Sequence, residues 1–168
     1  HALMTDKVHE HGSLAGVELW VGGAGAPNLL TREVAMSVGS MPNSGGHPYQ
    51  TRTMDKQDIK NVRRWHRDAA LRAREAGFDI VYVHATHSYL LSQFLSPVHN
   101  QRTDEYGGSL ENRMCLPLEI LNAVRAAFPD DKPISCRISA TDWVGDDGII
   151  TDDPPVLIEV LQKSGIKF

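Results

Sequence analysis

Short, almost wholly apolar runs alternate along the chain with segments whose apolar residues recur every three or four positions. The runs at residues 14–21, 78–83 and 133–139 are rich in Val, Ile and Leu and contain few charges. Runs of this length and composition are typical of buried strands. A further run begins at residue 166. The pattern therefore predicts three strands and the start of a fourth, in the continuous apolar style of parallel sheets.

Helical periodicity fills most of the chain between these runs. Asp55 and Asp58 stand where the positive end of a helix dipole favours acids, and Ser109 is a plausible N-cap. Pro117 falls inside a helix, where it should cause a kink or remove a hydrogen bond. One apolar stripe consists of Ile59, Val62, His66, Ala69, Ala73 and Ala76. The predicted helices are 4–11, closed by Gly12, then 55–76, 109–128 and 153–164.

The loops that follow the strands are long, whereas those that follow the helices are short. Residues 22–52 show no period, 88–108 contain at most one short turn of helix, and 140–151 are rich in Gly and Asp. Long βα loops and short αβ loops are typical of a (β/α)8 barrel, and a doubly wound sheet is the rival α/β fold. Three strands make less than half of a barrel. The chain is therefore either a small open sheet or part of a larger structure.

Composition narrows the function classes. The 168 residues carry 17 Lys and Arg against 21 Asp and Glu, a formal net charge of −4 without a basic run. This balance argues against a nucleic-acid or anionic membrane surface. We find no apolar stretch near the ~18 residues of a membrane span and no signal peptide. Cys115 and Cys136 lack metal-type spacing, so we expect reduced thiols and a cytoplasmic protein.

Four polar residues interrupt the ends of the apolar strands. Glu18 lies in the first predicted strand, His84 and His87 end the second, and Arg137 lies in the third. At matched positions of parallel strands they would converge, and burying them without partners would be costly. A Glu18–Arg137 ion pair with two satisfied core histidines is one interpretation. A metal-binding histidine pair is another, although no third ligand is obvious.

Two other features have weaker interpretations. Gly23-Ala24-Gly25 follows a strand but fails as a dinucleotide fingerprint, because no helix follows it. The three tryptophans, Trp20, Trp65 and Trp143, are expected to be core residues.

Several motifs carry a resemblance to a known family. The chain resembles the old yellow enzyme (NADH:flavin oxidoreductase) family, and in its flanks the trimethylamine and dimethylamine dehydrogenase branch. The amine-branch segments are His9-Glu10-His11-Gly12, Gly16-Val17-Glu18-Leu19-Trp20, Ala26-Pro27-Asn28 and Ala76-Gly77-Phe78-Asp79. The segments similar to the whole family are His84-Ala85-Thr86-His87, Arg102-Thr103-Asp104-Glu105-Tyr106-Gly107-Gly108-Ser109 and Arg137-Ile138-Ser139-Ala140.

The resemblance implies a partial TIM (β/α)8 barrel with FMN at its C-terminal mouth. By position, the chain matches about strands 3 to 5 of the barrel and the start of strand 6. We therefore expect residues 1–168 to be a single segment of an FMN-binding domain, truncated at both ends and inactive alone. The family's phosphate-binding segment would lie outside it. An iron–sulfur cluster of the parent protein would also have its ligands outside this chain.

The resemblance also implies roles for single residues. Glu18 and Arg137 match positions that contact the polar edge of the flavin, where a cation stabilises the charge gained on reduction. His84 and His87 match a pair that binds a substrate oxygen or a small anion. Tyr89 matches a proton donor. The predicted catalytic and substrate-binding residues are thus His84, His87 and Tyr89, and the predicted cofactor-binding residues are Glu18 and Arg137.

The substrate depends on which branch applies. The amine branch implies oxidation of a methylated amine or N-methyl amino acid, but trimethylamine dehydrogenase has Tyr where this chain has His84. The His84 and His87 pair is that of the ene-reductases, which act on activated alkenes. A metal-dependent TIM-barrel hydrolase is the alternative from another class. We expect a small-molecule substrate, NAD(P)H or an electron-transfer flavoprotein as electron partner, no nucleic acid or membrane partner, and a homo-oligomer.

Overall fold

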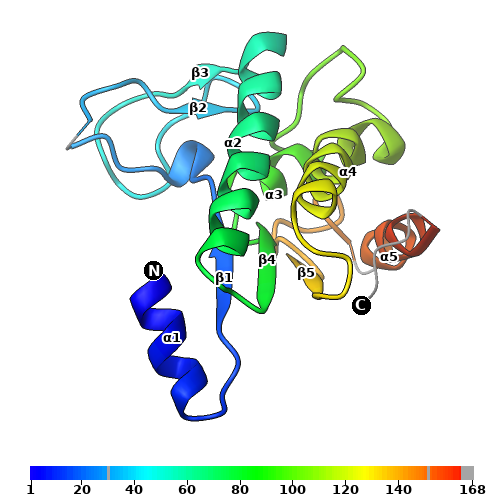
Figure 1. Ribbon diagram of the computed structural model, residues 1–168. Coiled ribbons are helices and arrows are strands. Elements are labelled where there is room, and N and C mark those ends of the chain that lie inside the picture. The colour runs from blue at the N-terminus through cyan, green and yellow to red at the C-terminus, as the bar shows by residue number, and fades with distance from the viewer. Residues whose placement is uncertain (30, 151, 164–168) are drawn as a thin grey trace.

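A parallel sheet of three strands forms the centre of the molecule. The computed structural model describes residues 1–29, 31–150 and 152–163 (Figure 1). The strands are β1 (Gly16–Leu19), β4 (Ile80–Ala85) and β5 (Ile134–Ile138), in the order β1-β4-β5. Both neighbouring pairs are parallel, with Val83 beside Leu19 on one side and Cys136 on the other. The three predicted strands are confirmed, and the start of a fourth lies outside the described residues.

The described part of the chain contains five helices. The longest, α2, begins at a capping box in which the Asp55 carboxylate accepts from the Asp58 backbone N–H and the Asp58 carboxylate accepts from that of Asp55. Ser109 caps α4 as predicted, and Pro117 lies inside that helix. The helices are α1 (Ala2–Glu10), α2 (Lys56–Glu75), α3 (Leu90–Leu95), α4 (Leu110–Ala127) and α5 (Asp153–Lys163).

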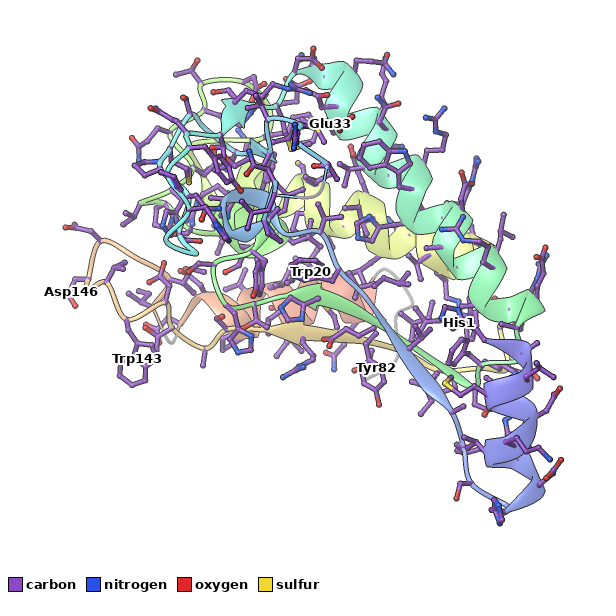
Figure 2. All side chains as sticks on the ribbon, turned by 90° about the vertical axis from the view of Figure 1, so that its left-hand side faces the viewer. His1, Trp20, Glu33, Tyr82, Trp143 and Asp146 are labelled. Carbon is purple, nitrogen blue, oxygen red and sulfur yellow. The ribbon has the colours of Figure 1, made fainter. Side chains whose placement is uncertain are left out.

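The two faces of the sheet differ. Helices α2 and α4 lie along one face, and the side chain of Tyr82 points away from them on the other (Figure 2). Because side chains alternate along a strand, Val81 and Val83 enter the core beneath the helices, whereas Glu18 and His84 share the face of Tyr82. The apolar core is therefore built on one side only. The other side carries the predicted site residues at the carboxyl ends of the strands.

One predicted loop contains structure that its pattern did not indicate. Residues 22–52 include a 3-10 turn, η1 (Gly23–Gly25), and a parallel pair of two-residue strands, β2 (Met36–Ser37) and β3 (Arg52–Thr53). Strand β1 (Gly16–Leu19) is also shorter than the predicted strand 14–21. Side-chain hydrogen bonds organise this region: the Asn43 amide donates to the carbonyls of Ala24, at 2.6 Å, and Ala26, at 3.2 Å. Such tertiary contacts leave no period in a sequence.

Residues 100–113, which include the motif from Arg102 to Ser109, brace the scaffold. The Asn100 amide donates to the carbonyls of Phe94 and Tyr106, both at 2.7 Å, and Arg102 pairs with the Asp104 carboxylate through two nitrogens. Buried Arg113 donates to two carbonyls, those of Leu95 and Gly108. The chain turns sharply at Gly107, where an added Cβ would lie 2.2 Å from the Arg102 carbonyl oxygen. The polar groups of these side chains make hydrogen bonds within the protein, so their role is structural.

The amino ends of the strands are tied together through Asp79. Its carboxylate accepts from the Ala15 backbone N–H at 2.9 Å, lies 2.7 Å from His9 Nε2, and lies 3.4 Å from Lys132 Nζ. The Ala15 hydrogen bond, followed by that of His9, lowers the pKa of Asp79 to about 2. The residues come from just before each of the three strands. This cluster, which we call the base of the sheet, is a structural clamp.

Neither cysteine is in a disulfide: Cys115 and Cys136 are both free thiols, as expected. Burial raises the pKa of the Cys136 thiol to about 12, so this side chain stays protonated and unreactive. No helix within the described ranges is long and apolar enough to cross a bilayer.

Candidate active site

Three of the predicted site residues meet at the carboxyl ends of the strands, one from each strand. His84 Nδ1 lies 2.9 Å from Glu18 Oε1. Arg137 Nη1 donates to both carboxylate oxygens of Glu18, each at 3.3 Å. The strand register explains the meeting, because His84 is directly beside Arg137 and Glu18 is beside Tyr82. We call Glu18, His84 and Arg137 the mouth triad.

The electrostatics of the triad favour an ionised Glu18. Burial would by itself raise the pKa of this carboxyl, but the hydrogen bond from His84 and the charges of His84 and Arg137 outweigh it, so the pKa is lowered. The predicted Glu18–Arg137 ion pair therefore exists. It is not an internal pair, however, since the Arg137 side chain is 52% exposed. A guanidinium held here by a carboxylate still has donors free to face a ligand.

His84 is buried but only half satisfied. Its side chain is 8% exposed, and its Nε2 atom is buried with no hydrogen-bond partner. Because Nδ1 faces a carboxylate, Nδ1 carries a proton, and Nε2 accepts when the ring is neutral and donates when it is charged. A satisfied core histidine does not leave such an atom. Four buried side-chain nitrogens in the described residues lack a partner, namely Arg63 Nε, His84 Nε2, His99 Nδ1 and Arg125 Nε, and Nε2 of His84 is the one that belongs to the triad, where a ligand could supply the missing partner.

His87 stands at the exposed rim of the same place. Its ring centroid is 5.5 Å from that of His84, and its backbone has φ +57, in the left-handed region that bulky residues rarely adopt. Ser139 lies beneath this turn, with its hydroxyl 2.6 Å from that of Thr86 and 3.4 Å from the His87 backbone nitrogen. The interpretation of both histidines as satisfied core residues is therefore wrong for His87 as well.

Tyr89 completes the group of predicted side chains. It caps the start of α3, and its ring packs edge-on against His84, at 5.4 Å between centroids, and against Trp20, at 5.1 Å. The ring fits because position 25, the last residue of η1, is a glycine: an added Cβ at Gly25 would lie 2.7 Å from Tyr89 Cε1. The structure thus brings all five predicted residues to one end of the sheet. Their catalytic and binding roles stay predictions.

Sequence reasoning misplaced the tryptophans and missed a supporting residue. Trp20, Trp65 and Trp143 are 47%, 42% and 89% exposed, so the expectation of three core residues was wrong.

Gln93 was not singled out, yet its buried amide donates to the Ser88 carbonyl and its oxygen accepts from Ala24 N at 3.4 Å. It thereby joins η1 to the turn that carries His87 and Ser88. A glutamine inside an apolar helix was the signal for it.

The described residues contain no group of three or more His, Cys, Asp or Glu side chains arranged to hold a metal ion. FMN, by contrast, suits the residues present. The polar edge of its ring carries carbonyl and N–H groups, and the mouth triad offers a cation and a carboxylate on the open face of the sheet. The orphaned Nε2 of His84 lies beside them, where a ligand above a flavin would need a partner.

Comparison with known proteins shows which family the chain resembles along its whole length. The model of the NADH:flavin oxidoreductase / NADH oxidase family matches residues 1–168. Dimethylamine dehydrogenase of Hyphomicrobium sp. (strain x) is 37% identical over 165 residues, covering 94% of this chain and 22% of that protein. NADPH dehydrogenase of Clostridium acetobutylicum is 35% identical over 161 residues, covering 96% and 47%.

A solved structure gives the same result in three dimensions. Histamine dehydrogenase from Rhizobium sp. 4-9 superposes with a TM-score of 0.88 at 38% identity, covering 95% of this chain and 24% of that one. The predicted α/β fold, a part of a TIM barrel, is thereby confirmed. The chain spans 22–47% of the curated relatives described above.

Proposed function

The chain belongs to the NADH:flavin oxidoreductase / NADH oxidase family, and from this premise we propose that it forms part of the FMN-binding barrel of a longer, flavin-dependent amine dehydrogenase. Its substrate is a methylated amine or an N-methyl amino acid. Two relatives support the amine reading, one called dimethylamine dehydrogenase and one called histamine dehydrogenase. The single observation that carries the proposal is the unpartnered Nε2 of His84 beside the Glu18–Arg137 pair.

When bound, FMN supplies the hydride chemistry. Arg137 would donate N–H groups to the polar edge of the ring, and Glu18 would orient both that guanidinium and the His84 imidazole. Because Glu18 is ionised and fixes Nδ1–H of His84, Nε2 is held toward the ligand position. The charge of Arg137 then acts from a fixed place, which is how preorganised groups stabilise developing charge.

The remaining side chains handle substrate and protons. His84 Nε2 and the exposed ring of His87 would bind a polar atom of the substrate from two sides, since their centroids are 5.5 Å apart. Tyr89 would hold or move a proton at its hydroxyl, with its ring set by Trp20 and His84. Electrons would leave to an electron-transfer flavoprotein or exchange with NAD(P)H.

A second candidate, an ene-reductase acting on activated alkenes, is favoured by the same histidines. A pair of ring nitrogens suits a carbonyl oxygen, and Tyr89 lies where a proton donor would be needed. The similarity to an NADPH dehydrogenase points the same way. The metal-dependent hydrolase has no comparable support, because the described residues provide no third ligand.

Flavin absorbance of the full-length protein separates the two candidates. Without oxygen, dimethylamine or dimethylglycine should bleach the yellow enzyme, and His84→Ala should slow the bleaching. If the alkene reading holds instead, NADPH bleaches the enzyme and cyclohexenone restores the colour. A purified full-length protein that shows no flavin absorbance, whether native or denatured, would contradict both.

A further inference from the structure

Trp143 is the most exposed large hydrophobic side chain in the described part of the chain, at 89%. It lies in the loop after β5, beyond the carboxyl ends of the strands, and projects on the side of the sheet to which Tyr82 points (Figure 2). An indole left in water at the open end of an active site loses the hydrophobic gain of burial. The exposure of Trp143 therefore needs a compensating contact with another molecule or another part of the protein.

The loop holds Trp143 in position. The Asp142 carboxylate accepts from Ser96 Oγ at 2.7 Å and from the Ile149 backbone N–H at 3.0 Å, and Gly148 is packed so closely that a Cβ would lie 2.1 Å from Asp142 Oδ1. The Trp143 backbone N–H donates to Thr141 Oγ1 at 3.1 Å. Since Ser96 caps the end of α3 and Tyr89 its start, one short helix connects this loop to the proposed site.

Between this loop and the turn after β4 lies an open cleft of about 420 Å³. Trp143 and His87 line it, together with the hydroxyls of Ser88, Ser139 and Thr141. Three of the four non-glycine residues with positive φ in the described ranges belong to it: His87 at +57, Ser88 at +56 and Trp143 at +61. Backbone strain of this kind gathers at binding and catalytic sites.

The charge of the loop favours a cation. Residues 140–150 contain three acids, Asp142, Asp146 and Asp147, and no Lys or Arg. Asp142 lines the cleft, Asp146 and Asp147 are exposed residues of the same loop outside its lining, and Arg137, the cation that precedes the loop, is paired with Glu18. An aromatic face attracts organic ammonium groups and stacks with planar rings. The cleft thus combines an apolar platform, hydrogen-bonding hydroxyls and one carboxylate, that of Asp142.

We propose that this cleft binds the aromatic ring of a cationic arylalkyl amine, and that Trp143 selects such substrates over small aliphatic amines. The proposal rests on the proposed amine-oxidising function and narrows its substrate class. The ring stacks on Trp143 while the amine points past His87 toward His84. Trp143, which lines the cleft, is then a specificity-determining residue.

Calorimetry on the full-length flavoprotein tests this without turnover. The probe is 2-phenylethylammonium, with phenylacetate as the matched anion and ethylammonium as the ring-free amine. Trp143→Ala should weaken binding of the probe about 10-fold, the size expected for loss of a stacking or cation–π contact, and Trp143→Phe should restore most of it. Trp65→Ala, which removes an exposed indole from α2, should leave the affinity unchanged. In the unmutated protein, the Trp143 indole resonance should shift on titration.

Equal probe affinity in Trp143→Ala and the unmutated protein would overturn the proposal. So would phenylacetate binding as tightly as the probe, or a Trp143→Ala protein that loses melting temperature but keeps its affinity, because Trp143 would then pack against another part of the protein. If Trp143→Ala fails to fold, Trp143→Phe and the indole titration decide. Failure of the proposed function is separate: it shows as the absence of bleaching by any amine.

Discussion

The two ends of the same parallel sheet carry similar residues in different states. At the base, Asp79 joins Ala15, His9 and Lys132 in contacts that satisfy its carboxylate. At the mouth, Glu18 joins His84 and Arg137, yet His84 Nε2 has no partner and Arg137 is half exposed. Each strand contributes one of its own residues to the mouth, and the segment just before each strand contributes one residue to the base. Of these two clusters, only the mouth has a buried side-chain atom without a hydrogen-bond partner.

The difference teaches how to separate scaffold from site. Barrel enzymes keep stability at the amino ends of their strands and chemistry at the carboxyl ends. The brace of residues 100–113 belongs with the base in this respect, because its arginines and amides end on protein carbonyls and carboxylates. The polar side chains of that segment therefore serve the structure, whereas in the mouth triad His84 Nε2 is left without a partner.

Removing the buried cation of the brace should have the largest effect. Arg113→Ala leaves the carbonyls of Leu95 and Gly108 without their donor, which should cost about 3 kcal/mol of unfolding free energy. Denaturant unfolding of the full-length protein measures this, with exposed Arg64→Ala as the control expected within about 0.5 kcal/mol of the unmutated protein. A matching loss in both variants would erase the distinction between brace and surface.

At the mouth, Arg137→Ala should change the flavin more than the fold. Loss of a charge-assisted contact, about 1.5–3 kcal/mol, corresponds to a two-electron potential roughly 30–60 mV lower. Spectroelectrochemistry measures it, and Arg137→Lys should recover part of the shift because it keeps the charge. An unchanged potential in Arg137→Ala would remove this residue from the cofactor site, whatever the melting temperature did.

A cation at the base should behave in the opposite way. Lys132 Nζ donates to the Phe78 carbonyl at 2.8 Å and approaches Asp79 at 3.4 Å. Lys132→Ala should therefore lower the unfolding free energy by about 1 kcal/mol and leave the flavin potential unchanged. A shifted potential would show that the two ends are coupled.

The smallest expected effect is one of pH at the base. The folded pKa of Asp79 is lowered from 3.8 to about 2, so its contribution to stability is complete above pH 3.8 and is lost as the pH falls toward 2. Asp79→Asn should make the stability profile flatter across this window. Melting temperatures of both proteins at a series of acidic pH values test it, and parallel profiles would show that Asp79 is not the titrating clamp.

Local pattern predicted the strands and most of the helices. The α2 stripe appears with Ile59, Val62, His66 and Ala73 buried, and Asp55 and Ser109 are caps. What the pattern missed depends on contacts between distant segments, such as Asn43 holding η1 or Gln93 joining η1 to the turn after β4. No periodicity encodes these contacts.

The candidate site was predictable where single polar residues interrupt apolar strands. Glu18, His84 and Arg137 stood out for that reason, and parallel strands had to bring them to one edge. The exposure of Trp143 could not be predicted, because hydrophobicity alone places an indole in the core. It follows instead from a left-handed backbone fixed by Asp142 and Gly148, which only the folded loop reveals.

One paired measurement tests most directly that the mouth binds ligand and the base holds the fold. The affinity of the full-length protein for acetate and phenol, and its melting temperature, are measured in His84→Ala, His87→Ala and Asp79→Asn. The account predicts that each histidine variant loses about 1–3 kcal/mol of ligand binding, the cost of an unmade hydrogen bond, with FMN retained. Asp79→Asn should lose melting temperature and keep its ligand affinity. Retained affinity in both histidine variants would contradict the account.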